Sequence, residues 1–346
     1  MNKKRHKLLA AVAAPVLLMT ASACGVGNAQ DSNGSGGYET TTIRYQSSSG
    51  GVIDLAEVAD ALGYLGPLEL ERLGDVQGGP ESLRAVATGQ VDYGGAFNGA
   101  VAKLTATGAP LKAVISYYGS SGDVDSSLLT LEDSKIMDPE DLVGKKVAVN
   151  TLGANAEAVL DTYLREGGLS DEQIDQVTLV PLPGISIEQA LRQRQVEAAY
   201  LFGALKEMAV ERGGVRSLVT DTDLVGPYNA GSYVLREDFI QRNPRTTEKF
   251  VGALAKALRY TQQQPLEKVR GVLATYLEEH GRADQVESLE LWRGTGVSSP
   301  GGVIRDEDYE LWLDWLEAEG EVEPGSIEVP DIYTNEFNPY AEEADQ

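Results

Sequence analysis

The feature that most constrains the fold is an alternation of strand-like and helix-like segments, which begins near Thr41 and begins again after Asp123. The strand-like segments are rich in β-branched and aromatic residues, and the helix-like segments space their apolar residues helically and end at Gly. Such chains form open sheets with helices on their faces. The pattern therefore predicts an α/β fold with two lobes and a helical C-terminal segment.

The expected elements follow from this pattern and from the turn residues between them. Expected strands cover residues 41–45, 68–73, 91–96, 111–118, 127–131, 147–150, 177–181, 196–201 and 231–235. Expected helices cover residues 53–62, 81–88, 98–106, 152–165, 187–194, 206–212, 244–263, 266–279, 283–292 and 306–318. Asn98 and Ser186 are expected as helix caps. The spacing of Leu311, Trp312, Trp315 and Leu316 predicts a buried helical face.

A short internal similarity links the two halves. Residues 82–93 can be laid on residues 188–199, because both read as a helix, then Gln-Val-acid, then a buried strand. The folded part, from about Tyr38, is roughly 300 residues long, which favours two lobes over one core. We expect one lobe to comprise residues 40–120 and 229–340 and the other residues 121–228, with hinges near 118–123 and 221–228.

The N-terminus has the features of a secretory signal peptide, expected over residues 1–23. A basic flank precedes the apolar residues 8–19, a run too short to span a membrane, and small residues lead to Cys24. These small residues, with the Gly/Ser/Asn-rich tether over residues 24–39, resemble the bacterial lipobox. We therefore expect a lipid on Cys24 that anchors the protein outside the cell membrane. Ordinary signal-peptidase cleavage after Ala23 also fits, because Ala21 and Ala23 form an Ala-x-Ala pattern. The match to the lipobox is imperfect, since a Leu usually stands at the position of Ala21.

The composition argues against several classes of function. The chain has 29 basic and 53 acidic residues and a net charge of −24, so it is not expected to bind nucleic acid. The only histidines are His6 and His280, and Cys24 is the only cysteine. This leaves no internal disulfide and no cluster with metal-ligand spacing. His280 precedes a helix-stopping Gly and is expected on the surface. We expect neither enzyme activity nor a cofactor or metal.

Four strand-to-helix junctions carry small or polar residues, where open α/β sheets bind ligands. Such a junction presents backbone N–H groups that suit an anionic oxygen, although it is also an ordinary helix start. The aromatic side chains of Phe97, Tyr117, Tyr118 and Phe202 lie at or after strand ends and are candidates for apolar walls. The junctions cover residues 46–51, 77–82, 97–99 and 152–155 and supply the candidate contacts Ser48, Ser49, Gly50, Gly79, Ser82, Phe97, Asn98, Gly153 and Asn155.

Several segments, taken in their order, resemble the type II periplasmic binding fold. Within it the chain resembles the solute-binding proteins for sulfonates, taurine, nitrate and thiamine-precursor pyrimidines. The first segment reads Leu83-x-x-Val86-x-x-Gly89-Gln90-Val91-Asp92-Tyr93-Gly94. The others are residues 108–114, 141–149, 236–239 and 332–335, so the resemblance covers nearly the whole chain after the leader.

The resemblance implies a monomer that captures a small-molecule solute between its lobes and delivers it to an ABC permease. It implies contact with the membrane through the lipid anchor only. By position, it places ligand contacts on Ser48, Ser49, Asn98, Gly153, Asn155 and Phe202.

The charge of the solute stays open. Sulfonate-type relatives often have Ser or Thr where this chain has residues 97–99 and 152–154. If two or more acidic residues lined the cleft, a simple anion would be disfavoured. A neutral, zwitterionic or cationic solute, such as a thiamine-precursor pyrimidine, is the alternative, and a sensor lipoprotein without transport is another. The acidic candidates are Asp54, Asp92, Asp123, Asp125, Glu157 and Glu188.

Overall fold

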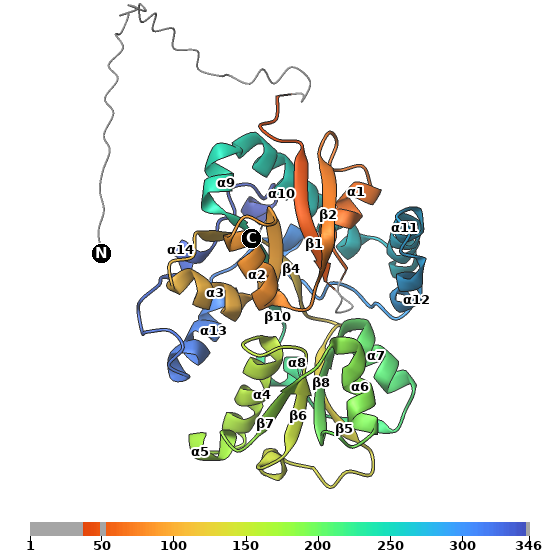
Figure 1. Cartoon of the computed structure of the whole chain (residues 1–346), viewed down its shortest axis with the longest axis vertical. Helices are drawn as coiled ribbons and strands as arrows, with labels where there is room; N and C mark the ends of the chain where they lie inside the picture. The colour runs from red at the N-terminus through yellow and green to blue at the C-terminus, as the bar shows by residue number, and fades with distance from the viewer. Residues whose placement is uncertain (1–36, 49–52, 344–346) are drawn as a thin grey trace, which may run out of the picture.

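The computed structural model describes residues 37–48 and 53–343 and shows two lobes, one above the other in Figure 1. Each lobe contains sheets flanked by helices, which confirms the predicted two-lobed α/β fold. Cys24 and the expected tether up to residue 36 lie outside the described residues.

The upper lobe contains two small sheets. Its strands are β1 (Thr42–Ser48), β2 (Glu69–Val76), β3 (Tyr93–Phe97), β4 (Leu111–Ser120) and β10 (Tyr228–Arg236). Strand β1 runs parallel to β2, and β10 lies between β3 and β4, antiparallel to both. Because β4 and β10 also carry the chain to and from the lower lobe, this antiparallel pair forms the connection between the lobes.

The lower lobe contains one five-stranded sheet. Its strands are β5 (Ser126–Leu131), β6 (Lys146–Val149), β7 (Thr178–Pro181), β8 (Ala198–Phe202) and β9 (Val215–Thr220). Their order is β7–β6–β8–β5–β9, and only β5 runs antiparallel to its neighbours. Strand β9 was not expected, because its residues are mostly half-exposed and lack a buried pattern.

Helices cover the sheets of both lobes (Figure 1). In the described part of the chain, no helix combines the length and the apolar character needed to cross a bilayer. The helices of the upper lobe are α1 (Leu55–Ala61), α2 (Gly79–Ala87), α3 (Asn98–Ala106), α9 (Glu237–Arg242), α10 (Pro244–Gln263), α11 (Leu266–Glu279), α12 (Val286–Leu289), α13 (Glu307–Ala318) and α14 (Val329–Ile332). Those of the lower lobe are α4 (Asn155–Glu166), α5 (Asp171–Ile174), α6 (Gly184–Arg192), α7 (Gly203–Glu211) and α8 (Asp221–Val225). Short 3-10 turns are η1 (Pro139–Leu142), η2 (Ala283–Gln285), η3 (Pro300–Gly302) and η4 (Ala341–Glu343).

Two predicted helix caps are wrong. Asn98 is the first residue of α3 and does not cap it, because its amide donates to the carbonyl oxygens of Asn229 and Asp308, both at 3.0 Å. Helix α6 begins at Gly184, with Pro183 at its cap, so Ser186 lies inside the helix. Both caps were chosen by residue type alone, and for Asn98 contacts with distant residues decide where the side chain bonds.

The C-terminal helices differ from the expectation in two places. In place of the predicted helix 283–292, the chain forms the short elements η2 and α12, which end at Leu289. After α12, the Arg270 guanidinium donates two hydrogen bonds to the Trp292 carbonyl oxygen, at 2.7 and 3.1 Å. In α13, Trp312 and Leu316 are buried as predicted, but Leu311 is 37% exposed. Helix α13 buries the face that contacts α3 and β10.

The internal similarity has a structural counterpart. Both halves contain a helix followed by a buried strand, α2–β3 in one and α6–β8 in the other. When these elements are superimposed by their bounds, Gln90 corresponds to Gln195, which differs by one residue from the predicted alignment. In this register Gly89, with a φ of 73°, corresponds to Arg194, with a φ of 56°. Arg194 is the only described residue other than Gly with a positive φ, which follows from its place in the same helix-ending turn.

One buried carboxylate joins the two chain crossings between the lobes. The side chain of Asp221 is fully buried. It accepts hydrogen bonds from the Ser120 hydroxyl at 2.5 Å and the Ser126 N–H at 3.0 Å on the outgoing crossing. It also accepts from the Thr222 N–H at 2.9 Å and the Tyr228 hydroxyl at 3.0 Å on the return. Burial raises the pKa of Asp221, and these donors oppose that rise.

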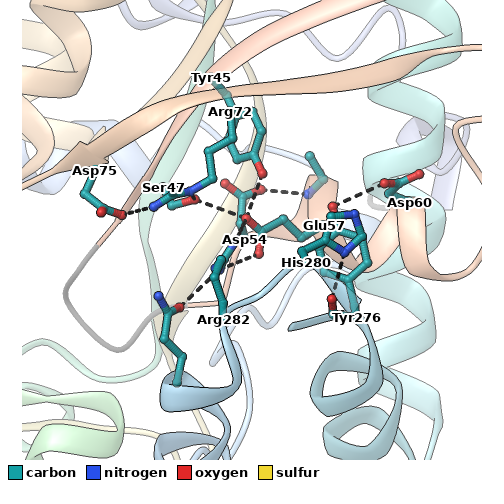
Figure 2. Close-up of polar contacts among 12 residues, drawn as sticks. Tyr45, Ser47, Asp54, Glu57, Asp60, Arg72, Asp75, Tyr276, His280 and Arg282 are labelled. Carbon is teal, nitrogen blue, oxygen red and sulfur yellow. Dashed lines mark hydrogen bonds and ion pairs between the residues drawn. The ribbon is translucent and has the colours of Figure 1, made fainter. Parts of the chain in front are cut away.

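A second buried carboxylate, that of Glu57 on α1, holds the upper lobe together on the side of α11 (Figure 2). Glu57 is 2% exposed and binds the Arg282 guanidinium through both oxygens, at 2.6 and 3.0 Å. The Tyr45 hydroxyl, at 2.8 Å, and the Ser47 hydroxyl, at 3.1 Å, donate to the same carboxylate. This cluster links β1, α1 and the turn after α11.

Replacing Asp221 by Ala should lower the free energy of unfolding by about 2–4 kcal/mol, because several buried donors lose their acceptor. Urea unfolding measures this loss. Asp223→Ala, an exposed position in the same helix, is the matched control and should cost about 1 kcal/mol or less. Equal losses in the two variants would contradict a special role for Asp221.

Arg282→Met should cost about 3–5 kcal/mol, because it leaves the Glu57 carboxylate buried without its partner. The double variant Glu57→Gln/Arg282→Met should recover part of the loss, since no buried charge remains. Denaturant unfolding of both variants tests this. A single variant within about 0.5 kcal/mol of the parent would show that the pair does not matter.

Candidate functional site

A cavity of about 110 Å³ lies between the lobes and is lined by residues from both. From the upper lobe come the ends of β3 and β4, the start of α2 and the segment around Trp292. From the lower lobe come the starts of α4 and α7 and the ends of β6 and β8. Strand ends and helix starts thus meet here, as expected for a ligand site in open α/β sheets.

Three helix N-termini open onto this cavity. Gly79, Asn155 and Gly203 are the first residues of α2, α4 and α7, and all three line the cavity. The N-cap residues of these helices, Gly78, Ala154 and Phe202, have no side-chain oxygen that could cap the helix. The first N–H groups of a helix have no partner inside the helix, and the helix dipole makes this end positive. The cavity therefore offers backbone donors to an acceptor group on a ligand.

Gly79 is required by the packing of this wall. A Cβ atom at Gly79 would lie 2.7 Å from the Cβ of Ala96 on β3. The start of α2 therefore approaches β3 closely enough to exclude any side chain at this position. This contact places the first turn of α2 beside the end of β3, where Phe97 lies.

Aromatic rings form much of the remaining wall. Phe97 and Tyr117 line the cavity from the upper lobe and Phe202 from the lower lobe. The Phe97 ring meets the ring of Trp312 edge to face, with centroids 4.7 Å apart, so the core of the upper lobe fixes it. The Tyr117 and Tyr118 rings are also edge to face, at 4.8 Å. Such walls favour a ligand with an apolar or planar part.

Asn155 is held in place by two tyrosines. Its Nδ2 lies 3.3 Å from the Tyr200 hydroxyl, and its Oδ1 lies 3.0 Å from the Tyr228 hydroxyl. Burial raises the pKa of both tyrosines far above its usual value, so both stay protonated. The Tyr228 hydroxyl also lies 3.0 Å from Asp221, which connects the cavity wall to the chain crossings.

Among the described residues that line this cavity, Asp125 is the one acidic side chain, and an ion pair with Lys206 on α7 offsets its charge. No lysine, arginine or histidine is among the described residues that line the cavity. Over the same described ranges, no group of His, Cys, Asp or Glu side chains is arranged to hold a metal ion.

The predicted contact residues fall into three groups. Ser49 and Gly50 lie outside the described residues, as does the side chain of Ser48. Three predicted contacts lie elsewhere than at the cavity. Ser82 lines an adjoining pocket, where its hydroxyl accepts a hydrogen bond from the Gly95 N–H at 3.1 Å. Asn98 is buried in the upper lobe, and Gly153 lines a separate surface pocket. The structure brings five together at the cavity, namely Gly79, Phe97, Tyr117, Asn155 and Phe202.

Sequence reasoning missed one wall of the cavity, formed by Trp292, Gly294 and Thr295. This segment reaches the connection between the lobes, where the Thr295 carbonyl oxygen accepts from the Gly119 N–H at 2.9 Å. A Cβ atom at Gly296, whose φ is 69°, would lie 2.0 Å from the Gly119 oxygen. The Gly-Thr-Gly run was the available signal, since paired glycines mark a close backbone approach.

Solved structures similar to this one are mainly binding proteins. One is the alkanesulfonate-binding protein SsuA from Xanthomonas axonopodis pv. citri bound to MOPS, with 19% identity, a TM-score of 0.65 and 85% of this chain and 99% of that chain covered. Another is the periplasmic nitrate-binding protein NrtA from Synechocystis PCC 6803, with 13% identity, a TM-score of 0.69 and 89% of each chain covered. The desulfurization enzyme DszB is also similar, with 13% identity, a TM-score of 0.62 and 89% of this chain and 100% of that chain covered.

At these identities the likeness shows the fold, which is that of periplasmic binding proteins. No functionally curated protein matches the chain in sequence. The family model described as NMT1/THI5 like matches residues 58–268, which is more than half of the chain. The protein therefore belongs to the NMT1/THI5-like family.

Proposed function

We propose that this protein is the extracytoplasmic solute-binding component of an ABC importer. In this role it captures a small organic solute in the cavity between the lobes and delivers it to a permease. The observation that carries the proposal is the convergence of three uncapped helix N-termini, from both lobes, on one aromatic cavity. The family membership and the similarity to solved binding proteins support it.

The chemistry of the walls favours an organic solute with an oxygen-rich head, such as a sulfonate. Backbone N–H groups at the starts of α4 and α7 suit the head, and the rings of Phe97 and Phe202 suit an apolar body. Nitrate has no apolar part that would use these rings. We therefore place a sulfonate-type solute before nitrate.

A neutral or cationic solute, such as a thiamine-precursor pyrimidine, is the second candidate. The observation that favours it is the absence of a basic side chain among the described residues of the wall. A planar ring would also stack on the aromatic side chains.

We propose a binding role without bond chemistry. His280 is the only histidine among the described residues, and it lies exposed at the end of α11, with its ring stacked on Tyr276 at 3.9 Å. The cavity wall, so far as the structure describes it, therefore lacks the usual general base.

We also propose that closure moves the lobe of residues 121–228 against the lobe of residues 40–120 and 229–340. The hinges would lie near residues 118–123 and 221–228, where both crossings donate to Asp221. In this proposal Gly79, Phe97, Tyr117, Asn155 and Phe202 contact the solute, and the protein acts as a monomer.

Phe202→Ala should weaken solute binding about tenfold, because it removes one aromatic wall from the lower lobe. Isothermal titration calorimetry with an alkanesulfonate, taurine, nitrate and an aminopyrimidine would measure this for whichever compound binds. Phe239→Ala is the matched control, since Phe239 is half-buried in the upper lobe away from the cavity. The proposed function is contradicted if none of these compounds binds the parent protein. It is also contradicted if Phe202→Ala and Phe239→Ala weaken binding by the same factor.

Export and lipid anchoring rest on the N-terminal sequence alone. Cys24→Ala should release the protein into the medium or periplasm, because the anchor would have no attachment site. Fractionation of cells that express each form measures this, with Ser22→Ala as the control. A Cys24→Ala protein that stays with the membrane would argue against the lipid. Secretion of both the parent protein and Cys24→Ala would favour ordinary cleavage after Ala23.

A further inference from the structure

A small inner pocket of about 60 Å³ adjoins the main cavity inside the upper lobe. The two share Ile53, Gly78, Gly79 and Tyr117 as walls. A solute in the main cavity therefore has a small space next to it, of a size that suits one small polar group or a few waters.

The inner pocket presents hydrogen-bond acceptors. The Asp54 carboxylate lines it, and one of its oxygens accepts from the Ala56 N–H at 2.8 Å and the Tyr93 hydroxyl at 2.9 Å. The Gln46 Oε1 atom also belongs to a residue of this wall, and it is buried without a hydrogen-bond partner among the described residues. A buried acceptor without a donor is costly, so a donor from a bound molecule would be favourable here.

No cation among the described residues forms an ion pair with Asp54. Among the described residues that line the inner pocket there is no lysine, arginine or histidine. The nearby guanidinium of Arg282 is committed to Glu57 through both of its terminal nitrogens, as Figure 2 shows.

This isolation affects the protonation of Asp54. Burial and the neighbouring Glu57 carboxylate raise the pKa of Asp54 to about 7. Above that pH the carboxylate is charged without a counter-ion, and the folded state becomes less favourable as pH rises through the pKa. A bound cation would supply the missing counter-ion.

We propose that the inner pocket is a subsite for a positively charged amino group of the solute, held by the carboxylate of Asp54 and the amide oxygen of Gln46. The inference rests on the proposed function, because the rest of the solute would lie in the main cavity, with its acceptor end at the starts of α4 and α7. It narrows the solute to a molecule with a donor group at one end and an acceptor group at the other.

The proposal carries a defined pH dependence. Binding of an ammonium group should strengthen as pH rises through about 7, because Asp54 then becomes an anion. Burial raises the pKa of the surrounding tyrosines well above this range, so they stay neutral there. The described ionisable groups around Asp54 are Glu57 with its partner Arg282, the hydroxyls of Tyr45, Tyr93, Tyr117, Tyr233 and Tyr276, and the carboxylates of Asp75 and Asp284, which line a second pocket together with Asp54.

Methylammonium chloride is a direct probe, because it carries only the group that the subsite would take. At about 100 mM and pH about 8 it should raise the Tm of the full-length protein by about 2 °C over the same concentration of sodium chloride. The gain should fall by at least half at pH about 6, where Asp54 is mostly protonated.

Asp54→Asn should abolish this gain, and the side chain can still cap α1, so the fold is expected to survive. Asp60→Asn, in the same helix but bonded to Tyr276 at 3.2 Å, is the matched control and should keep the gain. No gain over sodium chloride in the parent, or an equal gain in Asp54→Asn, would overturn the subsite. The calorimetric test on Phe202→Ala does not use this pocket, so failure of the subsite is distinguishable from failure of the proposed function.

Discussion

The chain crosses between the lobes twice, and both crossings donate hydrogen bonds to the buried carboxylate of Asp221. This carboxylate has no described lysine or arginine as a partner, so these donors must compensate for its burial. The arrangement fixes β4 beside β10 and, through Tyr228 and Asn155, fixes the start of α4 at the cavity. The position of the site therefore depends on how the crossings are held.

The cavity can bind a solute through two kinds of contact, neither of which uses a charged side chain. Uncapped helix starts supply N–H donors, and rings held by the core supply apolar surface. The same fold occurs in a sulfonate-binding protein, a nitrate-binding protein and a desulfurization enzyme. Side chains within the site, rather than the fold, must therefore decide what each protein binds.

The sequence predicted the fold class well, because alternating strands and helices are visible in local patterns. It also identified the junctions at Gly79 and Asn155, which depend only on a strand end followed by a helix start. Asn98 looked like the same signal, but its amide bonds to residues far away in the chain. The cavity wall at Trp292 and the hydrogen bonds of the buried Asp221 carboxylate were not predicted, for a related reason. Each depends on contacts between distant segments, which local spacing does not encode.

A crystal structure of the protein with its bound solute would test the central claim most directly. The account predicts density for a small organic molecule between Phe97 and Phe202, with its acceptor oxygens at the first N–H groups of α4 or α7. A solute bound elsewhere on the protein, with this cavity filled only by water, would contradict it.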